Sequence, residues 1–283
     1  MAICAMMCGF DTWSEITLFA QEREPWFRRW LSLPGGIPSH DTFNRIFATL
    51  PPASLKSIFQ AWIGDIMGDD KLVGQLAVDG KALRATAKGR GANAVHMVNV
   101  WSTELGMCVG QQKVADKSNE ITAIPELLQL LELKGCLVSI DAMGTQVKIA
   151  DTILKKSGDY LLAVKDNQPS LNTEVKEQFQ AYWDKNETDV SGHGFTEQFD
   201  SEHGRKEHRR CWVLVVDESM PVCQQWKAKT IIAVQAERIE NGKGYDFVRF
   251  YISSRALDAT SALKATRAHW SVESVPQAHK FAA

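Results

Sequence analysis

Two short apolar segments that each end in an aspartate constrain the fold of this chain more than any other feature. Residues 76–79 read Leu-Ala-Val-Asp, and residues 136–141 read Cys-Leu-Val-Ser-Ile-Asp. Such short apolar runs are typical of strands that are buried on both faces of a sheet. Amphipathic helices are predicted after them, at residues 120–134 and 145–156. This alternation of strands and helices predicts an α/β sheet with helices on both of its faces.

The regions on either side of this α/β segment have a different character. Residues 1–70 contain several short helical stretches separated by glycine and proline breaks, which predicts a small helical domain. Residues from about 166 to 244 contain one polar helix followed by strand-like stretches, which predicts a mostly β segment. We therefore expect a helical domain over residues 1–70 and an α/β domain over residues 71–283, interrupted at about 166–244.

Further elements are predicted within the second domain. Strands are expected at residues 96–101, 107–111, 160–164, 194–200, 210–216, 230–236 and 247–252, and helices at residues 170–184 and 258–273. The first two of these strands are expected to form a hairpin around residues 104–106.

Composition and charge limit the classes of protein to which the chain can belong. No apolar run approaches the ~20 residues that a membrane helix needs, so no membrane association is predicted. The six cysteines are scattered singly, which favours reduced thiols and a cytoplasmic location. The net charge of −2 is not that of a typical nucleic-acid-binding domain. Any contact with DNA must therefore come from local groups of basic residues.

The aspartates at the ends of the two apolar segments form the candidate catalytic site. Functional groups of an open α/β sheet collect at the carboxyl ends of its strands. If the two strands are neighbours, Asp79 and Asp141 lie close together and need a proton or a cation between them. Hard oxygen ligands favour Mg²⁺ or Mn²⁺, and Glu273, on the last predicted helix, would complete a site for two ions. Alternatively, Asp79 forms a turn before Gly80 and Asp141 caps the next helix.

Two groups of basic residues are candidates for contact with DNA phosphates. Lys81 and Arg84 follow Asp79 closely, and the densest basic run lies in the predicted insertion. The DNA-binding candidates in that run are Arg205, Lys206, Arg209 and Arg210. On a strand, alternate residues share a face, so Arg205 and Arg209 would face one way and Lys206 and Arg210 the other. A solvated surface is the alternative for both groups.

Two residues close to Glu273 have a structural and a functional interpretation. We expect a packing or surface role for His269 rather than metal ligation. Trp270 is expected in the core, and stacking on a displaced base is the alternative.

A set of motifs in a fixed order resembles one family. The chain is similar to the H-repeat-associated insertion-sequence transposases, which are linked to Rhs elements. The motifs that carry the resemblance lie at residues 77–81, 116–128, 140–144, 160–168, 203–205, 251–254 and 267–273, and residues 36–43 match the helical segment that precedes the catalytic domain.

The resemblance has direct implications for fold and function. It implies an RNase-H-like mixed α/β sheet with a mostly β insertion, preceded by a small helical N-terminal domain. It also implies a DDE transposase that cuts and joins DNA. Its catalytic, metal-ligating residues would be Asp79, Asp141 and Glu273, holding two Mg²⁺ (or Mn²⁺) ions. The implied partners are insertion-sequence ends, target DNA and a second copy of the chain in the DNA complex.

The sequence departs from the family pattern at two places. Asp166 stands where the family usually has glycine, and after Glu273 the family-like tail is replaced by a sequence containing Pro276. These departures predict a truncated copy, so an inactive remnant that keeps the fold and weak DNA binding is the alternative function. A third alternative, a small-molecule α/β hydrolase, would need a GxSxG nucleophile motif, which the sequence lacks.

Overall fold

The computed structural model describes most of the chain in two compact units. The described residues are 1–51, 54–55, 57–58, 61–62, 73–83, 95–114, 119–185, 194–202, 205–240 and 243–274. The first unit contains the helices α1 to α4, and the second contains the strands β1 to β9 and the helices α6 to α10.

Four helices form the described part of the first unit. They are α1 (Ala2–Met7), α2 (Trp13–Glu22), α3 (Glu24–Phe27) and α4 (His40–Thr49). A capping box starts α2, in which the Thr12 side chain accepts from the Glu15 N–H and the Glu15 carboxylate accepts from the Thr12 N–H. Ser39 caps α4, because its hydroxyl accepts a hydrogen bond from the Thr42 N–H.

A small aromatic core holds these helices together. Ile16 is fully buried, and Phe43 packs against the same cluster. The Trp13 ring stacks on Phe43 with ring centroids 6.4 Å apart and contacts Phe47 at 4.9 Å. The short helices therefore bury one shared apolar face, as the sequence predicted for this helical domain. The sequence also predicts a helix over residues 55–67; its described residues, 55, 57–58 and 61–62, are helical, and the others lie outside the described part of the chain.

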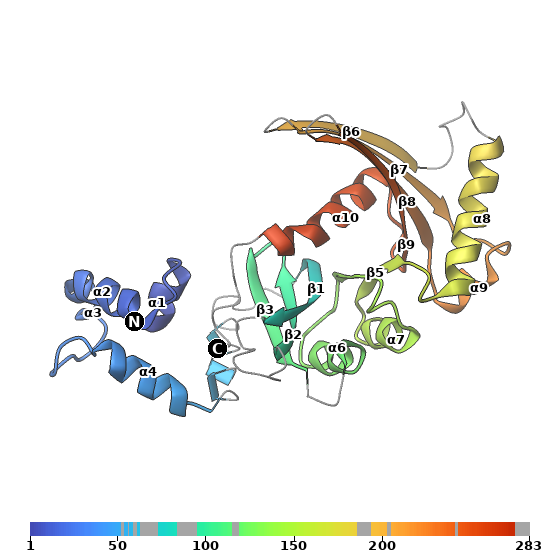
Figure 1. Cartoon of the computed structure of the whole chain (residues 1–283). Helices are drawn as coiled ribbons and strands as arrows, with labels where there is room; N and C mark the ends of the chain where they lie inside the picture. The colour runs from blue at the N-terminus through green and yellow to red at the C-terminus, as the bar shows by residue number, and fades with distance from the viewer. Residues whose placement is uncertain are drawn as a thin grey trace, which may run out of the picture. The chain divides into compact units, whose positions relative to one another are not determined.

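The second unit is built on one large mixed sheet (Figure 1). Its strands are β1 (Gly74–Leu83), β2 (Val95–Ser102), β3 (Met107–Lys113), β4 (Cys136–Ile140), β5 (Asp159–Val164), β6 (Gly194–Glu202), β7 (Arg205–Val215), β8 (Thr230–Glu240) and β9 (Lys243–Ser253). Its helices are α6 (Glu120–Gln129), α7 (Val147–Lys155), α8 (Pro169–Lys185), α9 (Pro221–Gln225) and α10 (Ala259–Ser274). The strand order is β3-β2-β1-β4-β5-β9-β8-β7-β6.

The α/β core agrees with the sequence except at the ends of its elements. The strands β1, β4 and β5 are parallel and adjacent, and β2 and β3 form the predicted hairpin. The helix α6 ends at Gln129, whereas the sequence predicted an end near residue 134. After it, Leu131 and Leu133 are buried while Glu132 is exposed. That period of two shows an extended segment rather than a further helical turn.

Helices cover both faces of the core sheet. Figure 1 shows α10 on one side of β1 to β3 and α6 with α7 on the other. Alternate residues of β4 confirm this arrangement. Ser139 contacts His269 of α10. Ile140 lies near Ile124 of α6, because a Cβ added at Gly144 would contact both side chains. Odd-numbered β4 residues therefore face α10, and even-numbered residues face α6.

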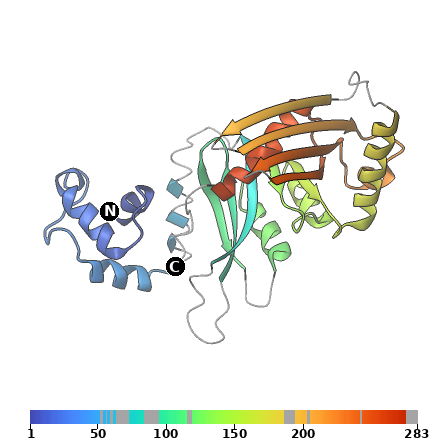
Figure 2. The ribbon, with the colours of Figure 1, turned by 45° about the horizontal axis from the view of Figure 1, so that its top comes forward.

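The strands β6 to β9 extend the core sheet instead of forming a separate one. The strand β9 pairs with β5 on one side and with β8 on the other, antiparallel in both cases. Figure 2 shows these strands (orange to red) side by side, with α8 (yellow) near one end of them. The buried face of this extension packs on the first half of α10, through Cys211, Val213, Ile232 and Ala262. The insertion thus provides the support for the C-terminal helix. No helix in the described residues is long and apolar enough to cross a membrane.

Candidate functional site

The two predicted aspartates occupy matching positions on neighbouring strands. Val78 of β1 and Ile140 of β4 are partners in the parallel ladder, so Asp79 and Asp141 are the next residue on each strand. Adjacent strands lie ~4.8 Å apart. The strands are therefore neighbours, which was the condition for a paired carboxylate site.

Period-two alternation places Asp79 on the face of the sheet that α10 covers. The side chain of Gln75, four residues earlier on β1, donates to the Ala265 carbonyl of α10 at 2.8 Å. Residues four apart on a strand share a face. Asp141 lines a pocket together with His269 and Trp270 of α10. Both aspartates therefore adjoin the helix on which Glu273 lies.

A buried polar network fixes α10 against β1 and β4, the strands of the two aspartates. Gln75 Nε2 donates to Ser139 Oγ at 2.8 Å, and Ser139 Oγ lies 3.1 Å from His269 Nδ1. Ser139 and His269 are both buried. Glu273 follows His269 by four residues in α10, which is about one helical turn. The network thus sets the position of the helical turn that carries Glu273.

His269 is a packing residue, as the sequence suggested. Burial lowers the pKa of its imidazole, and the negative charge of Asp141 only partly opposes this effect. A neutral, hydrogen-bonded ring between a helix and a sheet stabilises their contact.

Asp141 does not cap α7, because the N-cap of that helix is Gln146, but it stabilises the turn that precedes it. Its Oδ1 accepts a hydrogen bond from the Gly144 N–H at 3.2 Å. This bond stabilises the turn before α7 and uses one oxygen of the carboxylate. Asp141 can therefore stabilise the turn and also bind a metal, because its second carboxylate oxygen takes no part in the turn. Asp79 lies near Lys81, whose Nζ is 3.6 Å from Asp79 Oδ2.

Glu120, at the start of α6, is a carboxylate near the site that sequence reasoning missed. A Cβ placed on Gly80 would overlap its carboxylate group, so Glu120 occupies the space left by the glycine beside Asp79. Burial raises the pKa of the Glu120 carboxyl, the charge of Asp141 raises it further, and His96 lowers it. His96 Nδ1 lies 3.9 Å from Glu120 Oε1. A signal was present in the sequence, because Glu120 belongs to the 116–128 motif.

The carboxylates present an oxygen donor set of the type that Mg²⁺ and Mn²⁺ prefer. The donor groups are Asp79, which lies within β1 rather than at its end as the sequence predicted, and Asp141, which directly follows β4. Glu120 lies against Gly80, next to Asp79 in the chain. Among the side chains that the structure describes, no three His, Cys, Asp or Glu residues lie close enough to hold a metal ion. The side chain of Glu273 is outside that set. The residues fit a divalent cation by their chemistry and their adjacent strand positions.

The predicted DNA-contacting residues have different surroundings in the structure. Arg84 and the side chain of Arg205 lie outside the described residues. Lys206 is exposed on β7. Arg209 forms ion pairs with Asp200 and Glu207, and Arg210 pairs with Glu237 at 2.7 Å. Acidic neighbours thus neutralise much of the charge of this basic run.

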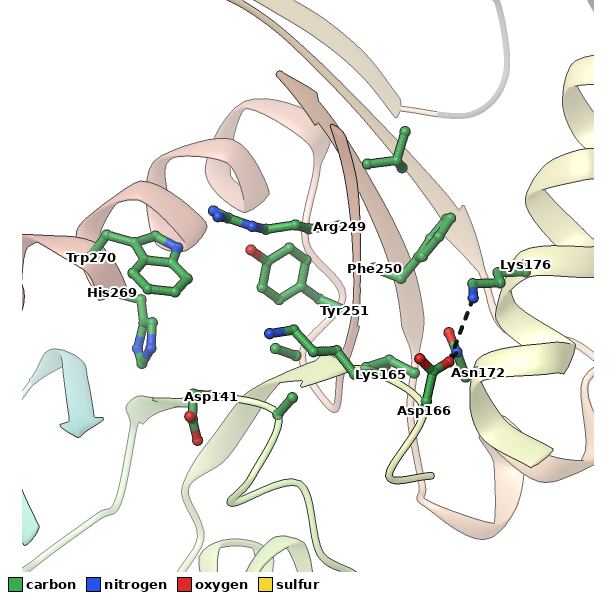
Figure 3. A pocket seen from close by; sticks show the side chains of 14 residues that line it. Asp141, Lys165, Asp166, Asn172, Lys176, Arg249, Phe250, Tyr251, His269 and Trp270 are labelled. Carbon is green, nitrogen blue, oxygen red and sulfur yellow. Dashed lines mark hydrogen bonds and ion pairs between the residues drawn. The ribbon is translucent and has the colours of Figure 1, made fainter. Parts of the chain in front are cut away.

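A pocket of about 200 Å³ opens beside Asp141, between β5, β9, α8 and α10 (Figure 3). Its lining includes the cations Lys165, Lys176 and Arg249. Trp270 also lines it, so this side chain is in part accessible rather than a core residue. The pocket therefore brings basic groups and an aromatic ring to one edge of the candidate site.

Comparison with protein families gives two matches that together span most of the chain. Residues 74–280 match the family described as Transposase DDE domain, and residues 1–63 match the associated family DDE_Tnp_1-associated. The matched domain family and the observed mixed sheet agree with the RNase-H-like fold class that the sequence predicted, and confirm it.

Curated relatives carry transposase names. A putative transposase, YncI, of Escherichia coli O157:H7 is 39% identical over 96% of this chain and 70% of its own length. The H repeat-associated putative transposase YhhI of Escherichia coli K12 is 38% identical over 96% of this chain and 73% of its own length. Among solved structures, a piggyBac transposase synaptic complex with hairpin DNA has a TM-score of 0.42 at 10% identity, covering 92% of this chain and 56% of that one.

Proposed function

Because the chain belongs to the DDE transposase family, we propose that it cuts and joins DNA at insertion-sequence ends with Asp79, Asp141 and Glu273 as its catalytic carboxylates. Membership of this family implies the use of a divalent metal. The observation that carries the proposal is the position of Asp79 and Asp141, each one residue beyond the paired residues Val78 and Ile140. The helix α10, which contains Glu273, packs on the same face of these strands.

The three carboxylates would hold Mg²⁺ or Mn²⁺, two ions by analogy with the two-metal enzymes. Bound there, divalent cations would activate an oxygen nucleophile and stabilise the leaving oxygen. The negative charge of the carboxylates offsets the charge of the cations. The protein's own contribution is geometric, since the two strands and the network around Ser139 hold the ligands in place before DNA arrives.

The reaction proposed has two steps. In the first, water attacks a phosphorus at the element end, the bond from phosphorus to the 3′-oxygen breaks, and a free 3′-hydroxyl results. In the second, this 3′-hydroxyl attacks a phosphorus of target DNA, forms the new phosphodiester bond and releases the target's own 3′-hydroxyl. Lys81, Arg84 and the basic run of the insertion would contribute phosphate contacts. We also propose a homodimer, because two element ends must be joined together.

The experiment uses the whole chain and a supercoiled plasmid that carries the insertion sequence with its flanking DNA. Cleavage with Mn²⁺ should fall by at least about a hundredfold in Asp79→Asn, Asp141→Asn and Glu273→Gln, since each variant loses one anionic ligand without a change of shape. Glu126→Gln is the matched control, because Glu126 is exposed on α6 and bonds to Gln112.

Two outcomes would count against the proposal. Equal cleavage by wild type and the Asp79 and Asp141 variants would overturn the assignment of the site. Specific binding to the element ends without cleavage under any metal would favour the alternative of a DNA-binding protein that lacks turnover.

A further inference from the structure

Two cations face each other directly across neighbouring strands beside the candidate site. The last partners of the antiparallel β5–β9 ladder are Val164 and Phe250. Lys165 and Arg249 are the next residue on each strand, so they occupy facing positions. Directly opposed residues of an antiparallel pair point to the same side of the sheet. Leu161, four residues before Lys165, and Tyr251, two residues after Arg249, both pack in the cluster that contains α10 residues. Residues two or four apart on a strand share a face, so Lys165 and Arg249 point to the side of the sheet that α10 covers.

Like charges at directly opposed positions destabilise a sheet. Within the residues that the structure describes, no carboxylate lies within ion-pairing distance of either Lys165 or Arg249. The third cation of the pocket differs, because Lys176 Nζ lies 3.9 Å from Asp166 Oδ1. The facing pair therefore carries two positive charges that no described carboxylate compensates. The basic run of β7, by contrast, has acidic partners for Arg209 and Arg210.

Aromatic rings hold the Arg249 guanidinium in a defined place. Its central carbon lies 4.6 Å from the centre of the Phe247 ring and 4.8 Å from the centre of the Trp270 ring. Contacts of this kind orient an arginine while leaving its N–H donors available. Trp270 belongs to α10, three residues before Glu273. Figure 3 shows Arg249 and Lys165 both extending toward the side of the pocket where Trp270 and His269 lie.

We propose that Lys165 and Arg249 form a clamp for a backbone phosphate of the DNA strand that lies next to the reaction centre. This inference rests on the proposed function, because it takes the strand bound at Asp141 as the source of the phosphate. Arg249 supplies a fork of N–H donors that suits two phosphate oxygens, and Lys165 supplies a mobile point charge. The anion removes the repulsion between the two cations.

The position of the clamp favours a DNA phosphate over a free one. The pocket is lined by Asp141 as well as by the two cations, so a strand with one phosphate at the carboxylate site would present a neighbouring phosphate to the clamp. At about 200 Å³, the space is below the ~300 Å³ typical of small-molecule sites, which suits part of one nucleotide. Lys165 and Arg249 are thus positioning residues for the strand.

The test measures DNA affinity as a function of salt concentration, without a metal that supports cleavage. The proteins are wild type, Lys165→Gln, Arg249→Gln and the double variant, and the probe is a fluorescent duplex oligonucleotide. The double variant should reduce the magnitude of the slope of log K against log salt by about 1, because the clamp neutralises one phosphate and its loss means that fewer counterions are released on binding. Each single variant should reduce the slope by less than the double variant. Lys148→Gln is the control, because Lys148 is an exposed lysine on α7 outside the pocket.

A second measurement separates a functional loss from a folding defect. Lys165→Gln removes one of two opposed charges, so its thermal midpoint without DNA should equal or exceed that of wild type. Arg249→Lys keeps the charge but loses the fork, so it should keep the salt slope and bind more weakly. An unchanged slope in both glutamine variants overturns the clamp. A reduction of the slope in Lys148→Gln equal to that in the glutamine variants of the pair would also overturn the clamp.

Inorganic phosphate, added at constant ionic strength, distinguishes the two sources of the anion. Phosphate binding that the double variant abolishes, together with an unchanged DNA slope, would assign the site to a free anion and overturn the proposal. The salt-dependence measurement does not require cleavage, so the clamp can be overturned while the Asp79 and Asp141 variants still lose activity. If those variants keep activity while the slopes fall as expected, the carboxylate assignment fails and the clamp stands as a DNA contact.

Discussion

The carboxylate of Glu120 occupies the space that a side chain at position 80 would fill. Gly80 follows Asp79 directly on β1, and Glu120 begins α6. An acidic group is therefore held against the backbone of β1, within the electrostatic influence of Asp141. The glycine is needed here for close approach, since Gly80 is not one of the residues with a positive φ.

This contact predicts that Glu120 supports divalent metal binding from outside the ligand set. Glu120→Gln should weaken Mn²⁺ binding about ten- to a hundredfold, as is typical for the groups that surround a metal's ligands. Gly80→Ala should have a similar effect, because its methyl group displaces the same carboxylate. Titration calorimetry of the single and double variants measures this.

The double variant is the decisive protein in that series. If the two residues act through one contact, Gly80→Ala should add little to Glu120→Gln. Fully additive losses would show two independent effects, and normal affinity in Glu120→Gln would assign Glu120 to the fold alone. Glu126→Gln, on the exposed side of the same helix, should bind Mn²⁺ like wild type.

Of the two paired arginines on β7, Arg209 should contribute more to the stability of the fold than Arg210. Arg209 pairs with Glu207, which is only 8% exposed, so Arg209→Ala removes a cation from beside a buried carboxylate. We expect a loss of about 3 kcal/mol in the free energy of unfolding. Arg210→Ala breaks a more exposed pair with Glu237 and should cost less than about 1 kcal/mol. Urea unfolding followed by circular dichroism measures both, and equal losses would contradict the division.

The stability of the second unit should decrease in mild acid because of His269. Its folded-state pKa lies below the ordinary value of 6.5, so the unfolded chain takes up a proton at a higher pH than the folded one. The stabilising contribution is therefore complete above the unfolded value and is lost as the pH falls below it. His269→Gln removes this ionisation and should flatten the change in unfolding free energy between about pH 7.5 and about pH 5.5.

An exposed histidine provides the control for the pH series. His40→Gln, in the first unit, should show the pH dependence of the wild type, because His40 lies near Asp41 on the surface. A pH dependence in His269→Gln that matches wild type would show that other groups govern the acid response.

Local pattern was sufficient to predict the elements that carry the acidic site. The apolar runs before Asp79 and Asp141 could only be buried strands, and the segments between them have helical periodicity. The position of Glu273 on the last helix followed in the same way. These strands and helices depend on residues that are close together in the chain, so a single sequence is enough to predict them. The roles of Asp79, Asp141 and Glu273 as metal ligands remain predictions.

The relations between segments that are distant in the sequence were decided by the tertiary structure. Periodicity does not state which strands become neighbours, so β9 beside β5, and with it the facing of Lys165 and Arg249, could not be read from the sequence. The approach of Glu120 to Gly80 and the pairing of Arg209 with Asp200 are of the same kind. The sequence by itself determined that Asp79 and Asp141 each follow a buried apolar run, because that depends on local burial, although β1 continues past Asp79 to Leu83. The charge environment of those residues depends on packing between remote elements, which only the folded chain brings together.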